Sequence, residues 1–392
     1  MSQINVETPT NLIRFNPDKL TQEAIDVLRS IFDKSGYNNT VCLPCPGGGS
    51  LLGEPARIVR FLQGHENCWK RSPQSGLYRH LFQLKKGNSP LVLFDLFWLN
   101  KQLPFSQLKD VLSDDSVHLL REASILSIQN DTVRAKVRCY PLYGKYFFFD
   151  PNWEQQDFVY MGWDSRLLVD VTASYTKGQH FNRVLDLCTG SGIQGLSLSA
   201  KSNEVFCADI NPRAIQFVQA NAKINGITNV QGITSDAFSN TPGNYDLIMA
   251  NTPYVPGDGG ELPIVGGDLG IEFTLRLIEQ IPDKITDQGM AILYTSDPIV
   301  NGKRRLLEKV KKQLGKYPFQ LTLIPLFRVN YPQTIPMMQH YDRLNLSGYD
   351  DCILIIQHAT KFETRRRSWD WMYYQRTCFD SWLDWKKRSK QK

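Results

Sequence analysis

Near the middle of the chain, an apolar run that contains one carboxylate is followed by a loop with glycines. The run Val184-Leu185-Asp186-Leu187 leads into Cys188-Thr189-Gly190-Ser191-Gly192, and a helical pattern begins directly afterwards. Gly190 and Gly192 permit a tight turn and a close approach of the backbone to a ligand, and the first turn of a helix offers free N–H groups. With Gly195 the segment also fits G-x-G-x-x-G, so this motif alone predicts either a nucleoside site or a dinucleotide site.

Carboxylates at the ends of three apolar runs help to decide between these ligands. Asp209 ends the second run, seventeen residues after the second glycine of the loop, where a carboxylate can bind both hydroxyls of a ribose. Asp186 stands before the loop, where it would repel a pyrophosphate but attract a positively charged amino-acid group. After the third run, Asp236 can accept a hydrogen bond from an adenine amino group, with Ala237 and Phe238 as apolar cover. These positions favour a nucleoside that carries an amino acid.

A fourth apolar run ends in Asn251-Thr252-Pro253-Tyr254, and with this group the pattern resembles class I S-adenosylmethionine-dependent methyltransferases. The similarity covers about residues 165–300, and each motif stands at the end of a predicted strand. It implies S-adenosyl-L-methionine as the cofactor. The implied cofactor-binding residues are Asp186, Gly190, Gly192, Asp209, Asp236, Ala237 and Asn251.

The fourth group is similar to the (D/N/S)-P-P-(Y/F) motif of methyltransferases that act on planar nitrogens, among them the release-factor glutamine methyltransferases and those of exocyclic amines on adenine and guanine. Such nitrogens are poor nucleophiles because their lone pair is delocalised. By resemblance, the Asn251 side-chain oxygen and the Thr252 carbonyl accept the two N–H bonds, Pro253 completes the motif, and the Tyr254 ring stacks on the planar group. Thr252 replaces the usual first Pro of the motif, so the rigidity of a Pro-Pro pair is absent.

The leading hypothesis is therefore methyl transfer to a planar nitrogen, an amide or an exocyclic amine, of a protein, an RNA or a metabolite. O- or C-methylation of a small molecule is an alternative that retains the motif as scaffold. A third hypothesis is a non-catalytic protein that keeps the cofactor fold and binds RNA or protein.

Strands and helices alternate from Phe181 onward, which is typical of a mostly parallel sheet covered on both faces. The predicted fold class is α/β, a doubly wound class I methyltransferase sheet preceded by a mainly helical, winged-helix-like domain. In that domain, helices are expected over 19–37, capped by Thr21, and over 56–63, 76–84, 91–99, 105–112 and 117–122, followed by a hairpin that turns at Asn130-Asp131. The predicted divisions are 1–160 for this domain, with a role in substrate recognition, 161–360 for the methyltransferase domain and 361–392 for an extension.

The formal net charge of +6 belongs to the extension. Residues 361–392 contain ten Lys or Arg and four Asp or Glu, whereas the rest of the chain has 35 of each sign. The extension also holds four of the eight Trp, at 369, 371, 382 and 385. Interleaved aromatic and basic residues suit contact with RNA, but the same aromatic residues at helical spacing suit packing on the protein, which is the preferred interpretation.

The composition, with 42% hydrophobic and 21% charged residues in 392, is typical of a globular protein. The N-terminal sequence lacks the basic and apolar regions of a signal peptide, and no apolar run reaches about 18 residues, so a cytoplasmic protein without a membrane span is expected. Cys42 and Cys45 have the spacing of metal ligands but lack a second pair, and no metal site is predicted.

Overall fold

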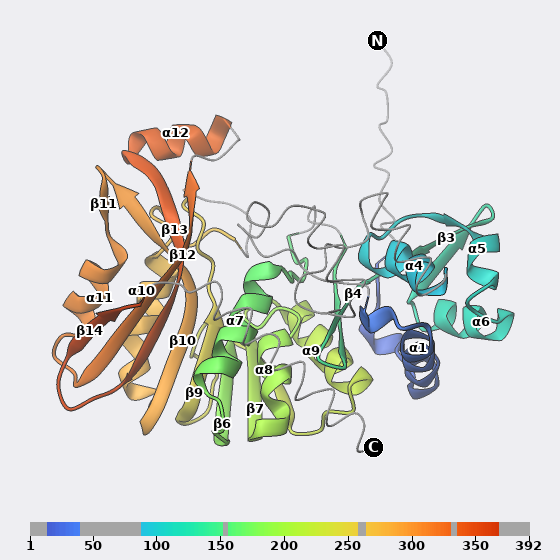
Figure 1. Cartoon of the computed structure of the whole chain (residues 1–392), viewed down its shortest axis with the longest axis horizontal. Coiled ribbons are helices and arrows are strands. Elements are labelled where there is room, and N and C mark those ends of the chain that lie inside the picture. The colour runs from blue at the N-terminus through green and yellow to red at the C-terminus, as the bar shows by residue number, and fades with distance from the viewer. Residues whose placement is uncertain (1–13, 40–87, 152–155, 258–263, 331–334, 368–392) are drawn as a thin grey trace, which may run out of the picture.

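The computed structural model describes residues 14–39, 88–151, 156–257, 264–330 and 335–367 (Figure 1). The helices predicted over 56–63 and 76–84, the pair Cys42 and Cys45, and the four Trp of the extension lie outside these residues. In the described part of the chain, no helix is both long enough and apolar enough to cross a membrane.

Helix α1 (Gln22–Ser35) has the start and the end that its sequence predicts. The Thr21 hydroxyl accepts a hydrogen bond from the Ala24 N–H at 3.2 Å, which caps the first turn. Gly36 ends the helix with a φ of 73°, a conformation that glycine adopts at little cost. The predicted helix is confirmed over a shorter range, with Leu28 on its buried face.

The other N-terminal elements are short. They are α4 (Ser89–Leu93), the π-helical turn Phe94–Trp98, β1 (Leu103–Pro104), α5 (Phe105–Lys109), α6 (Asp114–Glu122), β2 (Leu126–Gln129), β3 (Thr132–Ala135), β4 (Arg138–Leu142) and β5 (Lys145–Phe149). The predicted hairpin is confirmed, because Asn130 and Asp131 join β2 to β3 with φ values of 45° and 64°. A second hairpin, β4 with β5, was not predicted, and it turns at Tyr143 and Gly144.

Helix α9 (Pro212–Ile224) joins the N-terminal part to the large sheet, and Figure 1 shows it beside the N-terminal elements. Phe15 packs edge-on against Phe148 of β5 and Phe217 of α9, with ring centroids 5.7 and 5.6 Å apart. The Arg29 guanidinium of α1 donates to the Ile224 carbonyl at 2.7 Å. The N-terminal part is therefore packed firmly on the rest of the protein.

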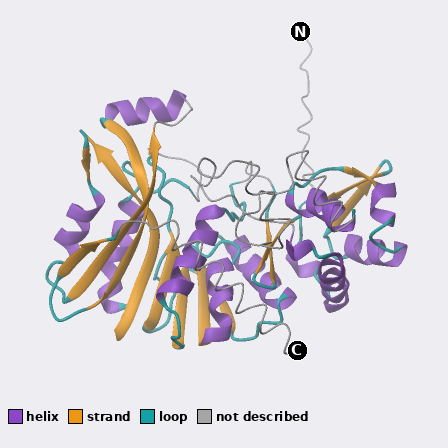
Figure 2. Ribbon diagram, viewed as in Figure 1, coloured by secondary structure: helices purple, strands orange, loops and turns teal. Residues whose placement is uncertain are grey.

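A 9-stranded sheet forms the core of the remaining chain (Figure 2). Its strands are β6 (Phe181–Leu187), β7 (Ser202–Asp209), β8 (Val230–Thr234), β9 (Tyr245–Asn251), β10 (Ile285–Val300), β11 (Lys303–Arg304), β12 (Phe319–Asn330), β13 (Leu346–His358) and β14 (Glu363–Arg366). The order is β14-β12-β13-β10-β9-β6-β7-β8, with β11 beside β10. Strands β6 to β10 are parallel to one another, whereas β13 is antiparallel to β10 and β12, and β11 is antiparallel to β10.

Helices cover both faces of this sheet. Helices α10 (Glu272–Gln280) and α11 (Leu306–Leu314) pack on the face that carries Leu185 and Leu187. Helices α7 (Trp163–Tyr175), α8 (Ile193–Leu198) and α9 pack on the other face, which carries Val184. The α/β doubly wound prediction is confirmed. The strand order reverses at β6, between β7 and β9, and ligands of such sheets bind beyond the carboxyl ends of the strands at this point.

Besides the β4–β5 hairpin, α7, α12 (Ile335–Arg343) and β14 were also not predicted. Helix α7 has a weak polar face because Asp164, Ser165 and Asp170 are buried together with its apolar residues, so its periodicity is hidden. Helix α12 lies between β12 and β13. Strand β14 pairs in parallel with β12, although it falls within the predicted extension.

Asp351 of β13 is a buried carboxyl whose ionisation should cost stability. Burial raises its pKa to about 8, and its Oδ2 atom accepts a hydrogen bond from the Tyr294 hydroxyl at 2.9 Å. The folded protein thus holds a proton that the unfolded chain releases above about pH 4, so the unfolding free energy falls between about pH 4 and 8, by up to about 1.4 kcal/mol per pH unit. Asp351→Asn should remove most of this dependence, because the variant has no carboxyl proton to release on unfolding. Urea unfolding at about pH 5.5 and 7.5 gives the slope of the unfolding free energy against pH for both proteins. Equal slopes in the two proteins would contradict the assignment.

Candidate active site

The carboxyl ends of β6, β7, β8 and β9 open into a cavity of about 650 Å³, a size typical of small-molecule sites. Eight of the predicted site residues line it: Gly190, Asp209, Asp236, Ala237, Asn251, Thr252, Pro253 and Tyr254. Asp186 and Gly192 do not line this cavity and lie behind its wall. The structure therefore brings residues from four separate strand ends to one ligand-sized space.

The two predicted glycines shape the loop after β6. Gly190 and Gly192 have φ values of 51° and 79°, which only glycine adopts freely. Gly192 is the N-cap of α8, and a Cβ atom there would lie 2.9 Å from Leu196 Cδ1. The Gly190 N–H donates to Asp209 Oδ2 at 2.9 Å, which ties the loop to the end of β7.

Asp186 organises this loop from behind. It is fully buried, and its Oδ2 atom accepts hydrogen bonds from the Thr189 hydroxyl at 2.5 Å and the Gly195 N–H at 2.9 Å. Burial raises its pKa to about 7. Direct contact of Asp186 with the amino-acid group of a cofactor stays a prediction, whereas its contacts with the loop are observed.

Asp209 lies where a carboxylate can meet a ribose. Its Oδ2 atom accepts the Gly190 N–H, and its Oδ1 atom accepts the Asn211 N–H at 3.0 Å. Burial raises its pKa. Each carboxylate oxygen has two acceptor sites, so one site on each remains for a ligand hydroxyl.

One of the unpaired buried polar atoms near the glycine loop, Gln194 Oε1, belongs to a residue that lines the cavity and can accept from a ligand ammonium group. Three atoms are shielded from solvent and have no hydrogen-bond partner among the described residues: Asp186 Oδ1, Ser191 Oγ and Gln194 Oε1. Gln194 lines the cavity and is 2% exposed. Leaving such atoms unpaired costs about 1 to 3 kcal/mol each, which a bound donor would offset. Gln194 was not predicted from the sequence, because a single Gln in an apolar helical segment gives no signal of its own.

Arg276 is a further residue of the site that the sequence did not reveal. Its guanidinium donates to both oxygens of Asp236, at 2.9 and 2.7 Å, and lies 4.8 Å from the centre of the Phe273 ring. This ion pair lowers the pKa of Asp236, so the carboxylate stays ionised at neutral pH. Both residues line the cavity. Each oxygen of Asp236 retains an acceptor site, as hydrogen bonding to an adenine amino group requires.

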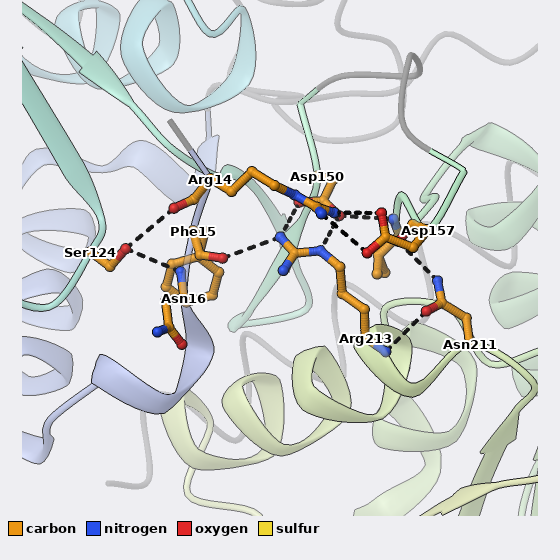
Figure 3. A network of polar contacts seen from close by, with 9 residues as sticks. Arg14, Phe15, Asn16, Ser124, Asp150, Asp157, Asn211 and Arg213 are labelled. Atoms are coloured by element: carbon orange, nitrogen blue, oxygen red, sulfur yellow. Dashed lines mark hydrogen bonds and ion pairs between the residues drawn. The ribbon is translucent and has the colours of Figure 1, made fainter. Parts of the chain in front are cut away.

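Residues 156–160 form a wall of the cavity that the body of the protein holds in place (Figure 3). The Arg213 guanidinium of α9 donates to both oxygens of Asp150, at 2.8 and 2.6 Å. Asp150 Oδ2 also accepts the Val159 N–H at 3.0 Å. Arg213 in addition donates to the Phe15 carbonyl at 3.2 Å, so one buried ion pair joins the wall, α9 and the N-terminal segment.

A second arginine extends these contacts to the part of the cavity wall beside Asp209. The Arg14 guanidinium donates to both oxygens of Asp157, at 3.1 and 3.0 Å (Figure 3). The Asn211 side chain donates to the Asp157 carbonyl at 2.9 Å, and the Asn211 N–H donates to Asp209. Hydrogen bonds therefore connect the N-terminal segment with the predicted ribose carboxylate.

Cys188 adopts a left-handed conformation in the glycine loop, with a φ of 53°, and lines the cavity. A residue with a Cβ atom pays about 1 to 2 kcal/mol in this region. We expect Cys188→Gly to keep the affinity for S-adenosylhomocysteine and to raise the unfolding free energy by about 0.5 to 1 kcal/mol. The β-branched variant Cys188→Val should lower the unfolding free energy by about 1 to 3 kcal/mol. Urea unfolding measures both, and a glycine variant less stable than the valine variant would refute the prediction.

Asn251 ends β9 with a defined side-chain orientation. Its Nδ2 atom donates to Ser165 Oγ at 3.2 Å, and its amide also interacts with the Asp164 carboxylate, whose pKa is raised by burial and lowered in part by this contact. Asp164 can only accept when ionised, so the amide nitrogen must face it and the amide oxygen must face away. No described residue donates to this oxygen, Oδ1, which is shielded from solvent. Asn251 therefore keeps an acceptor available, as the predicted role requires.

Thr252 replaces the missing proline with hydrogen bonds. Its N–H and its hydroxyl both donate to the Tyr294 carbonyl, at 3.2 and 2.9 Å. The hydroxyl also contacts the Thr274 hydroxyl at 2.8 Å, which in turn contacts the Thr295 hydroxyl at 2.8 Å. These buried contacts fix the segment to β10 and α10 and supply rigidity that a Pro-Pro pair would otherwise give.

Tyr254 is held on several sides. Its hydroxyl donates to Asp164 Oδ2 at 3.3 Å, and burial raises its pKa, which keeps the hydroxyl protonated. Its ring lies 5.2 Å from the Tyr294 ring and 6.4 Å from the Tyr349 ring. The Tyr254 carbonyl accepts from the Ser296 hydroxyl at 2.9 Å. A ring fixed in this way can serve as a stacking platform at the cavity.

Residues 162–267 match the family model of the methyltransferase small domain. This region is therefore similar to a methyltransferase domain. The match spans the glycine loop, the three carboxylates and the segment 251–254, so the predicted resemblance is confirmed for this region.

Known relatives share about a third of the chain. A release factor glutamine methyltransferase of Clostridium acetobutylicum is 30% identical over 151 residues, which are 33% of this chain and 52% of that protein. A putative protein N5-glutamine methyltransferase of Methanocaldococcus jannaschii is 29% identical over 136 residues, 33% of this chain and 68% of that protein. A ribosomal protein uL3 glutamine methyltransferase of Xanthomonas campestris pv. campestris is 30% identical over 129 residues, 29% of this chain and 42% of that protein. The chain thus spans about half the length of these relatives.

Proposed function

We propose that the protein transfers the methyl group of S-adenosylmethionine to a planar nitrogen, namely the side-chain amide of a protein glutamine. The observation that carries the proposal is the Asn251 amide, which lines the cavity of the glycine loop and keeps an unpaired oxygen. The relatives named above are glutamine methyltransferases, which supports an amide acceptor.

The cofactor would lie along the carboxyl ends of β6, β7 and β8. Asp209 would accept hydrogen bonds from the ribose hydroxyls, and Asp236 from the adenine amino group, with Ala237 against the ring. Gly190 would let the backbone approach the ligand, and the amide oxygen of Gln194 would accept from the ammonium group of the amino-acid part. When bound, S-adenosylmethionine supplies an electrophilic methyl group on a sulfonium.

Positioning of the acceptor would be the main catalytic contribution of the chain. The Asn251 oxygen and the Thr252 carbonyl would each accept one N–H of the glutamine amide and turn its lone pair toward the methyl group, while Tyr254 stacks on the amide plane. Alignment of this kind contributes up to about 7 to 11 kcal/mol in favourable systems. The new N–C bond forms as the S–C bond breaks, its electron pair stays on sulfur, and the methylated nitrogen then loses one proton to water. No strong base is needed, because that nitrogen is acidic.

The acceptor class can be tested with a labelled methyl donor. The protein is incubated with S-adenosylmethionine carrying a tritiated methyl group and with separate protein, RNA and small-molecule fractions of a cell extract. We expect label in the protein fraction, and N5-methylglutamine as the labelled residue after complete enzymatic digestion. Asn251→Ala is the matched control and should transfer no label.

Each other outcome would refute part of this proposal. Label on an exocyclic amine of RNA would exclude the glutamine acceptor but keep the planar nitrogen. Label on an oxygen or a carbon of a small molecule, whether a base-labile ester or a base-stable ether or C-methyl group, would indicate the alternative predicted from the sequence. Binding of the donor with no transfer to any fraction would favour a non-catalytic protein.

A further inference from the structure

Asp164, in the first turn of α7, is a buried carboxylate between the two residues that would present the acceptor. It is 2% exposed and lines the cavity. Its Oδ1 atom accepts the Ser165 N–H at 2.8 Å and the Tyr160 hydroxyl at 3.1 Å. Its Oδ2 atom accepts the Tyr254 hydroxyl at 3.3 Å. Burial raises the pKa of this carboxyl, and the interaction with the Asn251 amide is among the contacts that lower it. One side chain therefore interacts with four other residues of the cavity wall.

The local chain is built to admit this arrangement. At Gly162 a Cβ atom would lie 1.8 Å from the Tyr160 hydroxyl oxygen and 2.6 Å from Asp164 Oδ1, so any larger residue would displace both groups. None of the Lys or Arg residues in the described ranges forms an ion pair with Asp164. A buried carboxylate without a cation is costly, and a neutral group could pack there at lower cost. A group that only accepts hydrogen bonds must therefore have a specific use at this position.

That use follows from the shape of an amide. The oxygen and nitrogen ends of the Asn251 side chain are nearly equal in size, so packing alone does not decide which end faces the acceptor. Asp164 accepts but cannot donate when ionised, so it admits the nitrogen end and excludes the oxygen end. The same carboxylate fixes the Tyr254 ring through its hydroxyl.

We propose that Asp164 is the positioning residue of the acceptor site: it orients the Asn251 amide with its oxygen toward the nitrogen to be methylated and holds the Tyr254 ring in place. This inference rests on the proposed function for its catalytic consequence. The orientation of the amide itself can be measured without any acceptor.

The first test observes the Asn251 side-chain amide by NMR in the protein without acceptor. Its two N–H signals are identified by their loss in Asn251→Ala. We expect slow hydrogen exchange of these signals in the wild type and fast exchange in Asp164→Asn, because the variant replaces part of the carboxylate with a competing donor. Fast exchange in the wild type, or equal exchange in both proteins, would overturn the inference whatever the reaction is.

The second test compares turnover with cofactor binding, using the extract fraction that the wild type labels. Asp164→Asn should lower kcat about 10²-fold, the usual cost of losing a preorganised polar group, and should keep the affinity for S-adenosylhomocysteine. In the double variant Asp164→Asn/Asn251→Ala, kcat should fall little further, because both substitutions disrupt the same interacting pair of side chains. Unchanged kcat in Asp164→Asn, or fully additive losses, would overturn the inference.

Two further variants test whether a loss of kcat comes only from a folding defect. Asp170→Asn alters another buried carboxylate of α7, which bonds to Arg166 and the Tyr143 hydroxyl, and should retain the kcat of the wild type. Tyr254→Phe deletes one bond to Asp164 but keeps the ring, and should lower kcat about tenfold without unfolding the protein. An equal loss in Asp170→Asn and Asp164→Asn would show a general effect of buried charge and would overturn the specific role. Absence of methyl transfer by the wild type would refute the proposed function. The NMR experiment would still decide whether Asp164 orients the Asn251 amide.

Discussion

Asn251→Ala should lower methyl transfer by about 10²- to 10³-fold while it leaves the affinity for S-adenosylhomocysteine nearly unchanged. The variant removes the acceptor oxygen, the amide hydrogen bond to Ser165 and the amide interaction with Asp164, but it leaves the glycine loop and the carboxylates intact. The loss should therefore appear in kcat. Initial rates with labelled donor and calorimetric titration measure the two quantities.

Asn203→Ala is a suitable control for this prediction, because Asn203 is exposed on β7, does not line the cavity, and donates a hydrogen bond to the Asn182 side chain at 2.8 Å. It should behave as the wild type in both measurements. An Asn251→Ala protein that loses cofactor affinity as strongly as turnover would argue that Asn251 belongs to the cofactor site alone.

Asp209→Ala should have the opposite pattern, with a loss of about 10²-fold or more in affinity for S-adenosylhomocysteine. Hydrogen bonds to a charged group contribute about 1.5 to 3 kcal/mol each, and this carboxylate can bind two ribose hydroxyls. It also accepts the N–H groups of Gly190 and Asn211, so its removal should loosen the glycine loop. Calorimetry gives the affinity, and thermal unfolding reports the change in stability.

Glu204→Ala tests whether the effect is specific to Asp209. Glu204 lies on the same strand, and its exposed side chain pairs with Arg183 at 3.5 Å. We expect no change in affinity for this variant. An affinity of Asp209→Ala close to that of the wild type would remove the ribose assignment.

Residues at strand ends were predictable from the sequence because the carboxyl ends of neighbouring parallel strands lie at the same edge of the sheet. Apolar runs mark the strands, and the residues that follow them meet at one edge of the sheet. Gly190, Asp209, Asp236 and Asn251 follow four such runs, and all four line the cavity. The chain order of these motifs was therefore sufficient to predict which side chains come together.

Contacts between distant segments were not predictable in this way. Arg276 lies forty residues after Asp236 and reaches it only because α10 packs on the sheet beside β9 and β10. Asp164 precedes Asn251 by 87 residues, and its helix has no amphipathic pattern to reveal it. The link from Arg14 to Asp157 likewise depends on how the N-terminal segment packs on α9. Such pairs have no local spacing rule, so only the folded structure shows them.

The replacement of proline by Thr252 illustrates the same limit. The sequence showed the loss of a rigid Pro-Pro pair, but it did not show that the threonine hydroxyl and N–H both bond to the Tyr294 carbonyl. The position of that carbonyl follows from the parallel pairing of β9 with β10. Rigidity at this site is thus supplied by tertiary contacts.

Calorimetric titration of the wild-type protein with S-adenosylhomocysteine and, separately, with NAD tests the central claim most directly. The two ligands share an adenosine but differ in the group that meets the glycine loop, an amino acid in one and a pyrophosphate in the other. We expect one S-adenosylhomocysteine to bind per chain and NAD not to bind. Binding of NAD without binding of S-adenosylhomocysteine would contradict it.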